Sequence, residues 1–239
     1  MLAGHFATAL VARQYAPRGH IAYYLAASQL PDLLWHAFHF TGLEPTTPDN
    51  MMAVSLDNMH AQMTYSHDLL PTLGWIMLAI IAGRALFGRW RPGWIGGLVV
   101  LVHALADAIS GYPHHIFGPD SHQVGFGLYY SAPYLAVGIE AVFTALVLGW
   151  VLRTDAATGV RRSRATYRVW AAVFGGGLLF TFASADLSVA EVLGVEPLAA
   201  LSGTAVPLLV VIYVSMIAAL IWAEGQPNRS VGDGQAPGR

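Results

Sequence analysis

Two histidine–aspartate pairs stand out in a chain that is otherwise strongly apolar. His103 and Asp107 are four residues apart, and Asp32 and His36 have the same spacing. This spacing puts both side chains of a pair on one face of a helix, and facing helices can bring two such turns together in a bundle. Neutral imidazole and carboxylate suit zinc, iron or manganese. Two such ions could hold a bridging hydroxide for attack on an ester.

Each pair also has a simpler interpretation. Asp32 follows Pro31 and could cap a helix break. His103 and Asp107 could share a hydrogen bond with no metal between them. Several ionisable residues nevertheless fall on separate segments at one expected membrane depth, and ionisable groups within a membrane indicate a functional site by default. We therefore expect these residues to form a site.

The composition places the chain in a membrane. It has 239 residues, of which 55% are hydrophobic and 11% are charged, whereas a soluble domain carries about 25% charged residues. The formal net charge is -2, which offers no basic surface, so no nucleic-acid partner is expected. The absence of cysteine excludes disulfides, thiolate metal sites and thiol nucleophiles.

The segments that must position the site are apolar runs, and a membrane span needs roughly 20 such residues. The candidate spans are 69–87, 92–110, 131–152, 169–186 and 199–223, with 21–40 as a less apolar sixth. Residues 2–12 predict a short first helix, re-entrant or supported by its neighbours. The predicted fold is all-α, a polytopic transmembrane bundle of about 6–7 membrane helices. Residues 1–152 carry the site, 153–224 add C-terminal helices to the same bundle, and 225–239 form a disordered tail.

The arginines orient these spans. All twelve basic residues are arginines, and they fall in alternate connections or in the tail. The connections 41–66, 111–130 and 187–198 contain none. The positive-inside rule assigns the arginine-bearing connections to the cytoplasm, so we expect a bacterial inner-membrane protein whose arginine-free loops face outward.

The histidines follow the same division. All ten lie in the first 122 residues, and the expected topology puts every one except His20 toward the outward side. Glu140 lies within the span 131–152. It could pair with a histidine, support a ligand, or be protonated in the bundle interior.

Five short motifs resemble a known family when they are taken in order. They are GHFATAL (4–10), SQLPDLLWH (28–36), TYSHDLL (64–70), HALADAI (103–109) and VGFGLYYSAP (124–133). Together they resemble uncharacterised bacterial multi-pass membrane proteins akin to the membrane-bound, metal-dependent hydrolases described as LexA-binding and inner-membrane-associated. The order of residues is also reminiscent of the all-helical zinc phospholipase C and single-strand nuclease fold. The chain departs from the family pattern at Leu33-Leu34, where a second acid is usual, and at Asp68, which stands in place of a serine.

The resemblance covers roughly residues 1 to 150 and implies a ligand set. It implies that the metal is held by His5, Asp32, His67, His103 and Asp107. We expect His36 to be an additional ligand or an orienting partner, and His114 or His115 to move protons in catalysis. The cofactor would be a divalent metal, with zinc expected, and the bound water would be the nucleophile.

The leading hypothesis is therefore a metal-dependent hydrolase of a phosphoester or related bond in a lipid or envelope substrate. A different class of protein remains open at this point: a membrane protein that binds or transports a metal ion, or holds haem between helices. In either case the lipid bilayer is a partner.

Overall fold

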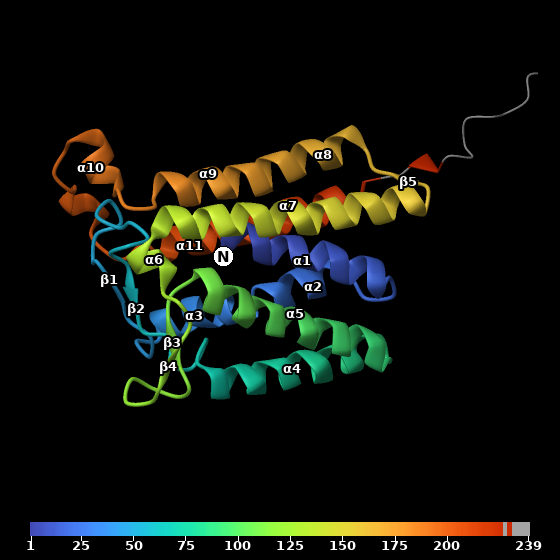
Figure 1. Ribbon diagram of the computed structural model, residues 1–239, viewed down its shortest axis with the longest axis horizontal. Helices are drawn as coiled ribbons and strands as arrows, with labels where there is room; N and C mark the ends of the chain where they lie inside the picture. The colour runs from blue at the N-terminus through green and yellow to red at the C-terminus, as the bar shows by residue number, and fades with distance from the viewer. Residues whose placement is uncertain (227–228, 231–239) are drawn as a thin grey trace, which may run out of the picture.

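The computed structural model describes residues 1–226 and 229–230, and it is mostly helical (Figure 1). The α-helices are, in chain order, α1 (Leu2–Tyr15), α2 (Ile21–Ser28), α3 (Leu30–Phe40), α4 (Leu69–Phe87), α5 (Trp90–Ser110), α6 (Leu128–Ser131), α7 (Pro133–Ala157), α8 (Arg164–Trp170), α9 (Gly176–Ala183), α10 (Val189–Leu193) and α11 (Val206–Glu224). A π-helical turn, η1 (Ala171–Gly175), joins α8 to α9, and a 3₁₀ turn, η2 (Ala199–Leu201), precedes α11.

The strands form short antiparallel pairs. They are β1 (Thr46–Thr47) with β2 (His60–Ala61), β3 (His114–His115) with β4 (Gln123–Val124), and β5 (Val160–Arg161) with β6 (Arg229–Ser230). The predicted disordered tail falls largely on 227–228 and 231–239, which lie outside the described residues; Gly225, Gln226 and β6 are the parts of it that are described.

Four helices are long and apolar enough to cross a membrane: α4, α5, α7 and α11. They confirm that four of the predicted segments are helices suited to span a bilayer. Their outward faces carry large apolar side chains such as Leu73, Leu98, Leu146 and Val211, each more than half exposed. Such a surface is stable against lipid but not against water.

The other predicted spans are interrupted. The segment predicted at 169–186 is a helical run from α8 through η1 to α9, with the π-helical turn in its middle. The segment 21–40 is divided at Gln29 into α2 and α3. Pro31 does not make this break, because it lies in the first turn of α3, where its missing N–H is not needed.

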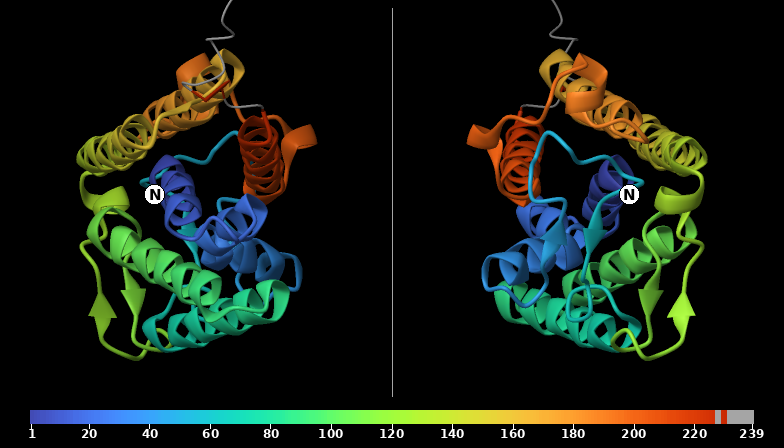
Figure 2. Two further views of the ribbon diagram at one scale, coloured as in Figure 1. Left: turned by 90° about the vertical axis from the view of Figure 1, so that its right-hand side faces the viewer. Right: turned by 90° about the vertical axis from the view of Figure 1, so that its left-hand side faces the viewer.

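The first helix is enclosed by the others. Helix α1 packs against α2, α5, α7 and α9, and the end-on views place it inside the surrounding helices (Figure 2). The core around it includes Phe6, Leu10, Tyr24, Leu25 and Leu220, all almost fully buried. Protein therefore surrounds α1 where lipid surrounds the outer helices, which explains how a helix too short to span is accommodated.

Helices α4 and α5 pack so closely that side chains are excluded between them. A Cβ atom added at Gly93 would lie 2.3 Å from the carbonyl oxygen of Ile80, and one added at Gly83 would lie 2.5 Å from the Cα of Gly93. Small residues at such a contact let two membrane helices approach closely. This contact fixes α5, the helix that carries His103 and Asp107, against α4.

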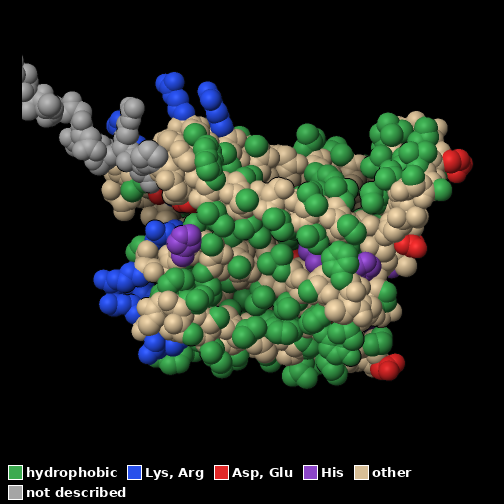
Figure 3. All heavy atoms as spheres, turned by 180° about the vertical axis from the view of Figure 1, so that it is seen from behind, with side chains coloured by type: hydrophobic (Ala, Val, Ile, Leu, Met, Phe, Trp, Pro, Cys, Tyr) green, Lys and Arg blue, Asp and Glu red, His purple; other side chains and the backbone are tan. Residues whose placement is uncertain are grey.

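The two ends of the molecule differ in charge. Arginine side chains gather at one end and acidic side chains at the other, with an apolar belt between them (Figure 3). At the arginine end, Arg162 forms ion pairs with the carboxylates of Asp155 and Glu224. The opposite, arginine-free end carries α6, α10 and the strand pairs β1–β2 and β3–β4 (Figure 1).

Candidate metal centre

Five of the predicted ligands converge from four segments of the chain. His5 comes from α1, Asp32 from the first turn of α3, His67 from the loop before α4, and His103 and Asp107 from the last two turns of α5. Each of these residues is at most 7% exposed. The helix period therefore explains one pair, and tertiary packing supplies the other three residues.

Four of these side chains alternate around a ring, which we call the Asp–His ring: Asp32, His67, Asp107 and His103. His67 Nε2 lies 3.3 Å from Asp32 Oδ1 and 4.0 Å from Asp107 Oδ2. His103 Nε2 lies 3.1 Å from Asp107 Oδ2 and 4.0 Å from Asp32 Oδ1. Each imidazole nitrogen is thus flanked by two carboxylates.

The ring has dimensions that suit a metal ion. Ligand atoms about 2.0–2.2 Å from a tetrahedral zinc lie about 3.3–3.6 Å from one another, close to the 3.1–4.0 Å spacing of the ring. The side chains that could hold an ion form two overlapping groups, namely His5, His103 and Asp107, and Asp32, His67 and His103. His103 belongs to both groups.

His103 turns its Nε2 toward the ring and its Nδ1 away from it. His103 Nδ1 lies 2.8 Å from the backbone carbonyl oxygen of Ser28, and a carbonyl can only accept, so Nδ1 carries the proton. In neutral His103, Nε2 is then a bare acceptor among carboxylates. It makes no hydrogen bond to the described residues, although Asp107 Oδ2 is only 3.1 Å away. Two acceptors at that distance require a cation, either a proton or a metal.

The other members of the ring are also held from outside. Ser66 Oγ lies 2.7 Å from His67 Nδ1, and the hydroxyl of Tyr213 donates to Asp32 Oδ2 at 2.9 Å. The loop that carries His67 is fixed in turn by buried Glu44, which accepts hydrogen bonds from the amides of Tyr65 and Ser66. Such outer partners orient ligands and are typical of metal sites in proteins.

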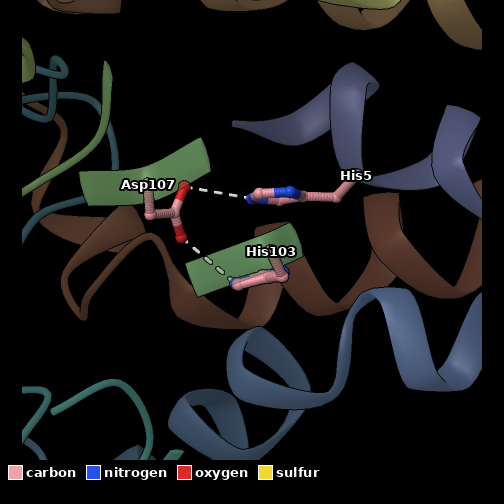
Figure 4. Close-up of side chains that lie close together, drawn as sticks. All are labelled: His5, His103 and Asp107. Atoms are coloured by element: carbon pink, nitrogen blue, oxygen red, sulfur yellow. Dashed lines mark hydrogen bonds and ion pairs between the residues drawn. The ribbon is translucent and has the colours of Figure 1, made fainter. Parts of the chain in front are cut away.

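His5 contacts one carboxylate oxygen of Asp107, and His103 contacts the other. Its Nε2 is 3.0 Å from Asp107 Oδ1, and its ring stacks on that of His103 with centroids 3.7 Å apart and an 18° angle (Figure 4). The α-amino nitrogen of Met1 also lies 2.5 Å from Asp107 Oδ1. Because stacked imidazoles direct their nitrogen lone pairs side by side, His5 is better placed to orient Asp107 than to share one ion with His103.

His36 and the histidines of the following loop occupy different positions. His36 is buried one turn after Asp32, but it lies outside both ligand groups, and its ring packs edge-on against Tyr213. His114 stacks on His67 with centroids 5.1 Å apart, and burial lowers the pKa of His114 to about 3. His115 is half-buried, and its amide donates to Asp68. Of the two predicted catalytic histidines, only His114 therefore faces the site.

A cavity of about 90 Å³ adjoins the ring. Asp32, His67, Asp107 and His114 line its polar side. The rest of its wall is largely apolar and comes from Met1, Leu2, Trp35, Leu56, Met59, Met63, Phe180 and Leu209, with Tyr112, Tyr129, Thr181 and Tyr213. A mostly apolar lining with a few convergent polar groups is typical of ligand sites, although those usually have volumes of about 300–1,000 Å³.

Glu140 supports the site without belonging to either ligand group. Its Oε1 accepts hydrogen bonds from the amides of Ala3 at 2.6 Å and Gly4 at 3.4 Å. The carboxylate therefore caps the first turn of α1, where free amides and the helix dipole attract negative charge. Of the three roles open to it from sequence, the structure favours that of a supporting residue.

Ser28, Glu44, Ser66 and Tyr213 were not predicted from the sequence. Ser66 is adjacent to the predicted ligand His67, and this proximity was a weak indication that Ser66 belongs to the site. Ser28 acts through its backbone carbonyl, and Tyr213 reaches Asp32 across 181 positions of sequence, so no local pattern marks either one. Comparison of the chain with protein-family models, with curated proteins and with solved structures gives no match.

Proposed function

We propose that this chain is an integral membrane protein whose Asp–His ring binds a divalent metal, zinc, and that it hydrolyses a phosphoester or related bond in a lipid or envelope substrate. The observation that carries this proposal is the ring itself, in which two imidazole nitrogens alternate with two carboxylate oxygens, 3.1–4.0 Å between neighbouring atoms. Zinc in such a site lowers the pKa of bound water and polarises the scissile bond.

Each surrounding residue has a part in this proposal. Asp32, His67, His103 and Asp107 bind the ion, and His5 orients Asp107 through their 3.0 Å contact. His114 lines the cavity beside His67, and its Nε2 is buried with no hydrogen bond to the described residues. It is therefore the residue placed to exchange a proton with the substrate. His36, although outside the ligand groups, holds the ring of Tyr213 that bonds Asp32.

The proposed setting is the bacterial inner membrane, with the Asp–His ring toward the outer leaflet. Helix α5 begins between Arg89 and Arg91 and carries Asp107 near its other end, so the positive-inside rule puts the ring on the outward side. A count of six or seven membrane helices follows if the run from α8 to α9 and the divided pair α2–α3 both cross, with α1 enclosed among them. The resemblance to membrane-bound metal-dependent hydrolases agrees with this proposal.

Transport and haem binding are less well supported. Between the ring and the arginine end, large apolar side chains such as Phe6, Leu10, Leu25 and Val151 pack in the interior beside α1, which does not favour the passage of an ion. Haem would require a far larger space than about 90 Å³ and two opposed histidines without carboxylates, whereas each ring histidine faces two carboxylates.

The activity can be tested in proteoliposomes. Zinc-loaded protein is placed in vesicles of phosphatidylethanolamine and phosphatidylglycerol, and lipid products are measured by mass spectrometry. We expect hydrolysis by the wild type and a loss of about 100-fold or more in His103→Ala, since the ion would be lost with its ligand. His122→Ala, a surface histidine variant, is the matched control and should retain activity. Equal product in wild-type and His103→Ala samples would contradict the proposal.

A further inference from the structure

The cavity beside the Asp–His ring is closed on its arginine-free side by a roof of loop residues. Leu56, Met59 and Met63 line it there, with Tyr112 and Tyr129. The hydroxyl of Tyr112 donates to the carbonyl of Leu56 at 2.8 Å. A substrate from the water on this side would have to displace these packed side chains.

The roof is also fastened to the connection between α9 and α11, residues 184–205. The amides of Leu56 and Asp57 donate to the carbonyls of Ser184 and Ala185, and the amide of Ala190 donates to the carbonyl of Met52. Backbone hydrogen bonds to two places in the connection make the roof and the connection one unit. Opening the cavity on its arginine-free side would break these hydrogen bonds.

The side of the cavity between α9 and α11 is built differently. Near the middle of the bundle the Met216 side chain reaches from α11 to α9, since a Cβ atom added at Gly177 would lie 3.5 Å from Met216 Cε. Farther toward the arginine-free end, Phe180 on α9 and Leu209 on α11 both line the cavity. In the end-on views, α9 and α11 lie apart (Figure 2).

Phe180 shows that this wall reaches the outer surface. It lines the cavity and is also 40% exposed, while its neighbours Leu179 and Phe182 are 67% and 55% exposed on the apolar outer face. In a membrane that face meets the hydrocarbon of the bilayer. A single side chain therefore spans the distance between the cavity and the lipid.

The connection above this wall exposes many large apolar side chains, together with the charged residues Glu191 and Glu196. Its large exposed side chains are Leu187, Val189, Val192, Leu193, Val195 and Leu198. They contribute to the apolar surface of the projection at the arginine-free end (Figure 3). Exposed apolar patches of this kind mark contact with a membrane or a partner, and here the patch directly continues the lipid-facing surface of α9.

We propose that one acyl chain of a membrane lipid enters between α9 and α11, so that the part of the chain next to its ester occupies the cavity and the polar bond meets the Asp–His ring. A cavity of about 90 Å³ holds only a short length of hydrocarbon, since an engineered cavity of about 150 Å³ holds one benzene. The rest of the lipid stays in the bilayer, which a lateral entrance permits. The chemistry at the ring rests on the proposed function, whereas the entry of the chain does not require it.

Photo-cross-linking tests this entrance directly. The full chain, loaded with zinc, is placed in phosphatidylethanolamine and phosphatidylglycerol vesicles that contain a phosphatidylcholine with a diazirine near the ester end of one acyl chain. After illumination, mass spectrometry maps the modified residues. We expect modification of cavity residues such as Met59, Met63 and Leu209, in addition to modification of the outer faces of the helices.

Matched tryptophan variants separate the entrance from general contact with lipid. Thr181→Trp fills the cavity from α9 and Leu209→Trp fills it from α11, and each should lower modification of Met59 and Met63 by about tenfold, because a packed interior leaves no room for the chain. Leu179→Trp on the outer face of α9 should leave that modification unchanged. Circular dichroism and size-exclusion chromatography of the same samples check that each variant keeps its fold, and metal content is measured separately.

The outcomes distinguish this inference from the proposed function. Cavity modification that falls in both filling variants supports the entrance, even if the wild type holds no metal, a result that would contradict the proposed function alone. Modification confined to outward positions such as Leu179, in wild-type protein that holds its metal, overturns the entrance and leaves the proposed function standing. Equal cavity modification in the wild type, Thr181→Trp and Leu209→Trp also overturns it.

Discussion

Asp107 uses its two carboxylate oxygens to join His5 and His103, which lie on different helices and stack on each other. Oδ1 is 3.0 Å from His5 Nε2, and Oδ2 is 3.1 Å from His103 Nε2 (Figure 4). The side chain therefore connects the buried first helix with the helix that carries half of the Asp–His ring. This arrangement makes Asp107 the residue on which the site most depends.

The contact between His5 and Asp107 predicts a difference between two substitutions. His5→Ala removes both the hydrogen bond and the stacked ring, so we expect the dissociation constant for zinc to rise by about 10–100-fold, the usual effect of losing an outer partner of a ligand. His5→Gln can still donate to Asp107 and should lose less affinity. Competition with a chelator of known affinity measures both. Equal losses in the two variants would show that His5 binds the ion itself.

Ser66 and Glu44 hold His67 in place, and their removal should weaken metal binding without abolishing it. Ser66→Ala removes the group 2.7 Å from His67 Nδ1, and we expect a loss of about 10-fold in zinc affinity. Glu44→Gln keeps the acceptor for the amides of Tyr65 and Ser66, so its effect should be smaller. The control is Ser121→Ala, in the loop between β3 and β4. Zinc affinity in Ser66→Ala equal to that of Ser121→Ala would contradict this role.

Glu140 should contribute to stability more than to metal binding. Glu140→Ala leaves the buried amides of Ala3 and Gly4 without their acceptor, which costs about 1–3 kcal/mol in the free energy of unfolding. Glu140→Gln retains an acceptor oxygen and should recover most of that loss. Unfolding in mixed micelles measures both variants. If Glu140→Gln were as destabilised as Glu140→Ala while both kept their zinc, the capping interpretation would be wrong.

The absence of cysteine makes the orientation simple to test. Phe126 is 73% exposed in the loop at the arginine-free end, so Phe126→Cys should react in intact cells with a maleimide that does not cross membranes. Arg161→Cys, at the other end, should react only after the cells are permeabilised. The reverse pattern would overturn the proposed outward orientation of the ring.

The sequence predicted the parts of the site that depend on helix periodicity and composition. His103 and Asp107 share a helix face as their spacing required, and four of the six predicted spans are helices suited to cross a membrane. The pair Asp32 and His36 shows the limit of that reasoning. Both lie on α3 and both contact Tyr213 from α11, but only Asp32 joins the ring.

The remaining features depend on contacts between distant segments. The amide groups at the start of α1 meet Glu140 from α7, and the carbonyl of Ser28 meets His103 from α5. Neither contact involves a pattern within one segment. The interruption of the 169–186 run by a π-helical turn likewise has no proline to mark it, and we have no physical account of that turn.

The metal content of the purified protein tests the central claim most directly. Protein is extracted in detergent, freed of loosely bound ions, and measured by plasma mass spectrometry beside Asp107→Asn, which keeps the side-chain shape but removes the charge. His39→Ala is the matched control, because His39 lies outside the ring and contacts Thr204. We expect about one zinc per chain in the wild type and in His39→Ala, and a loss of most of it in Asp107→Asn. A wild type with far less than one ion per chain, or full metal in Asp107→Asn, would contradict the account.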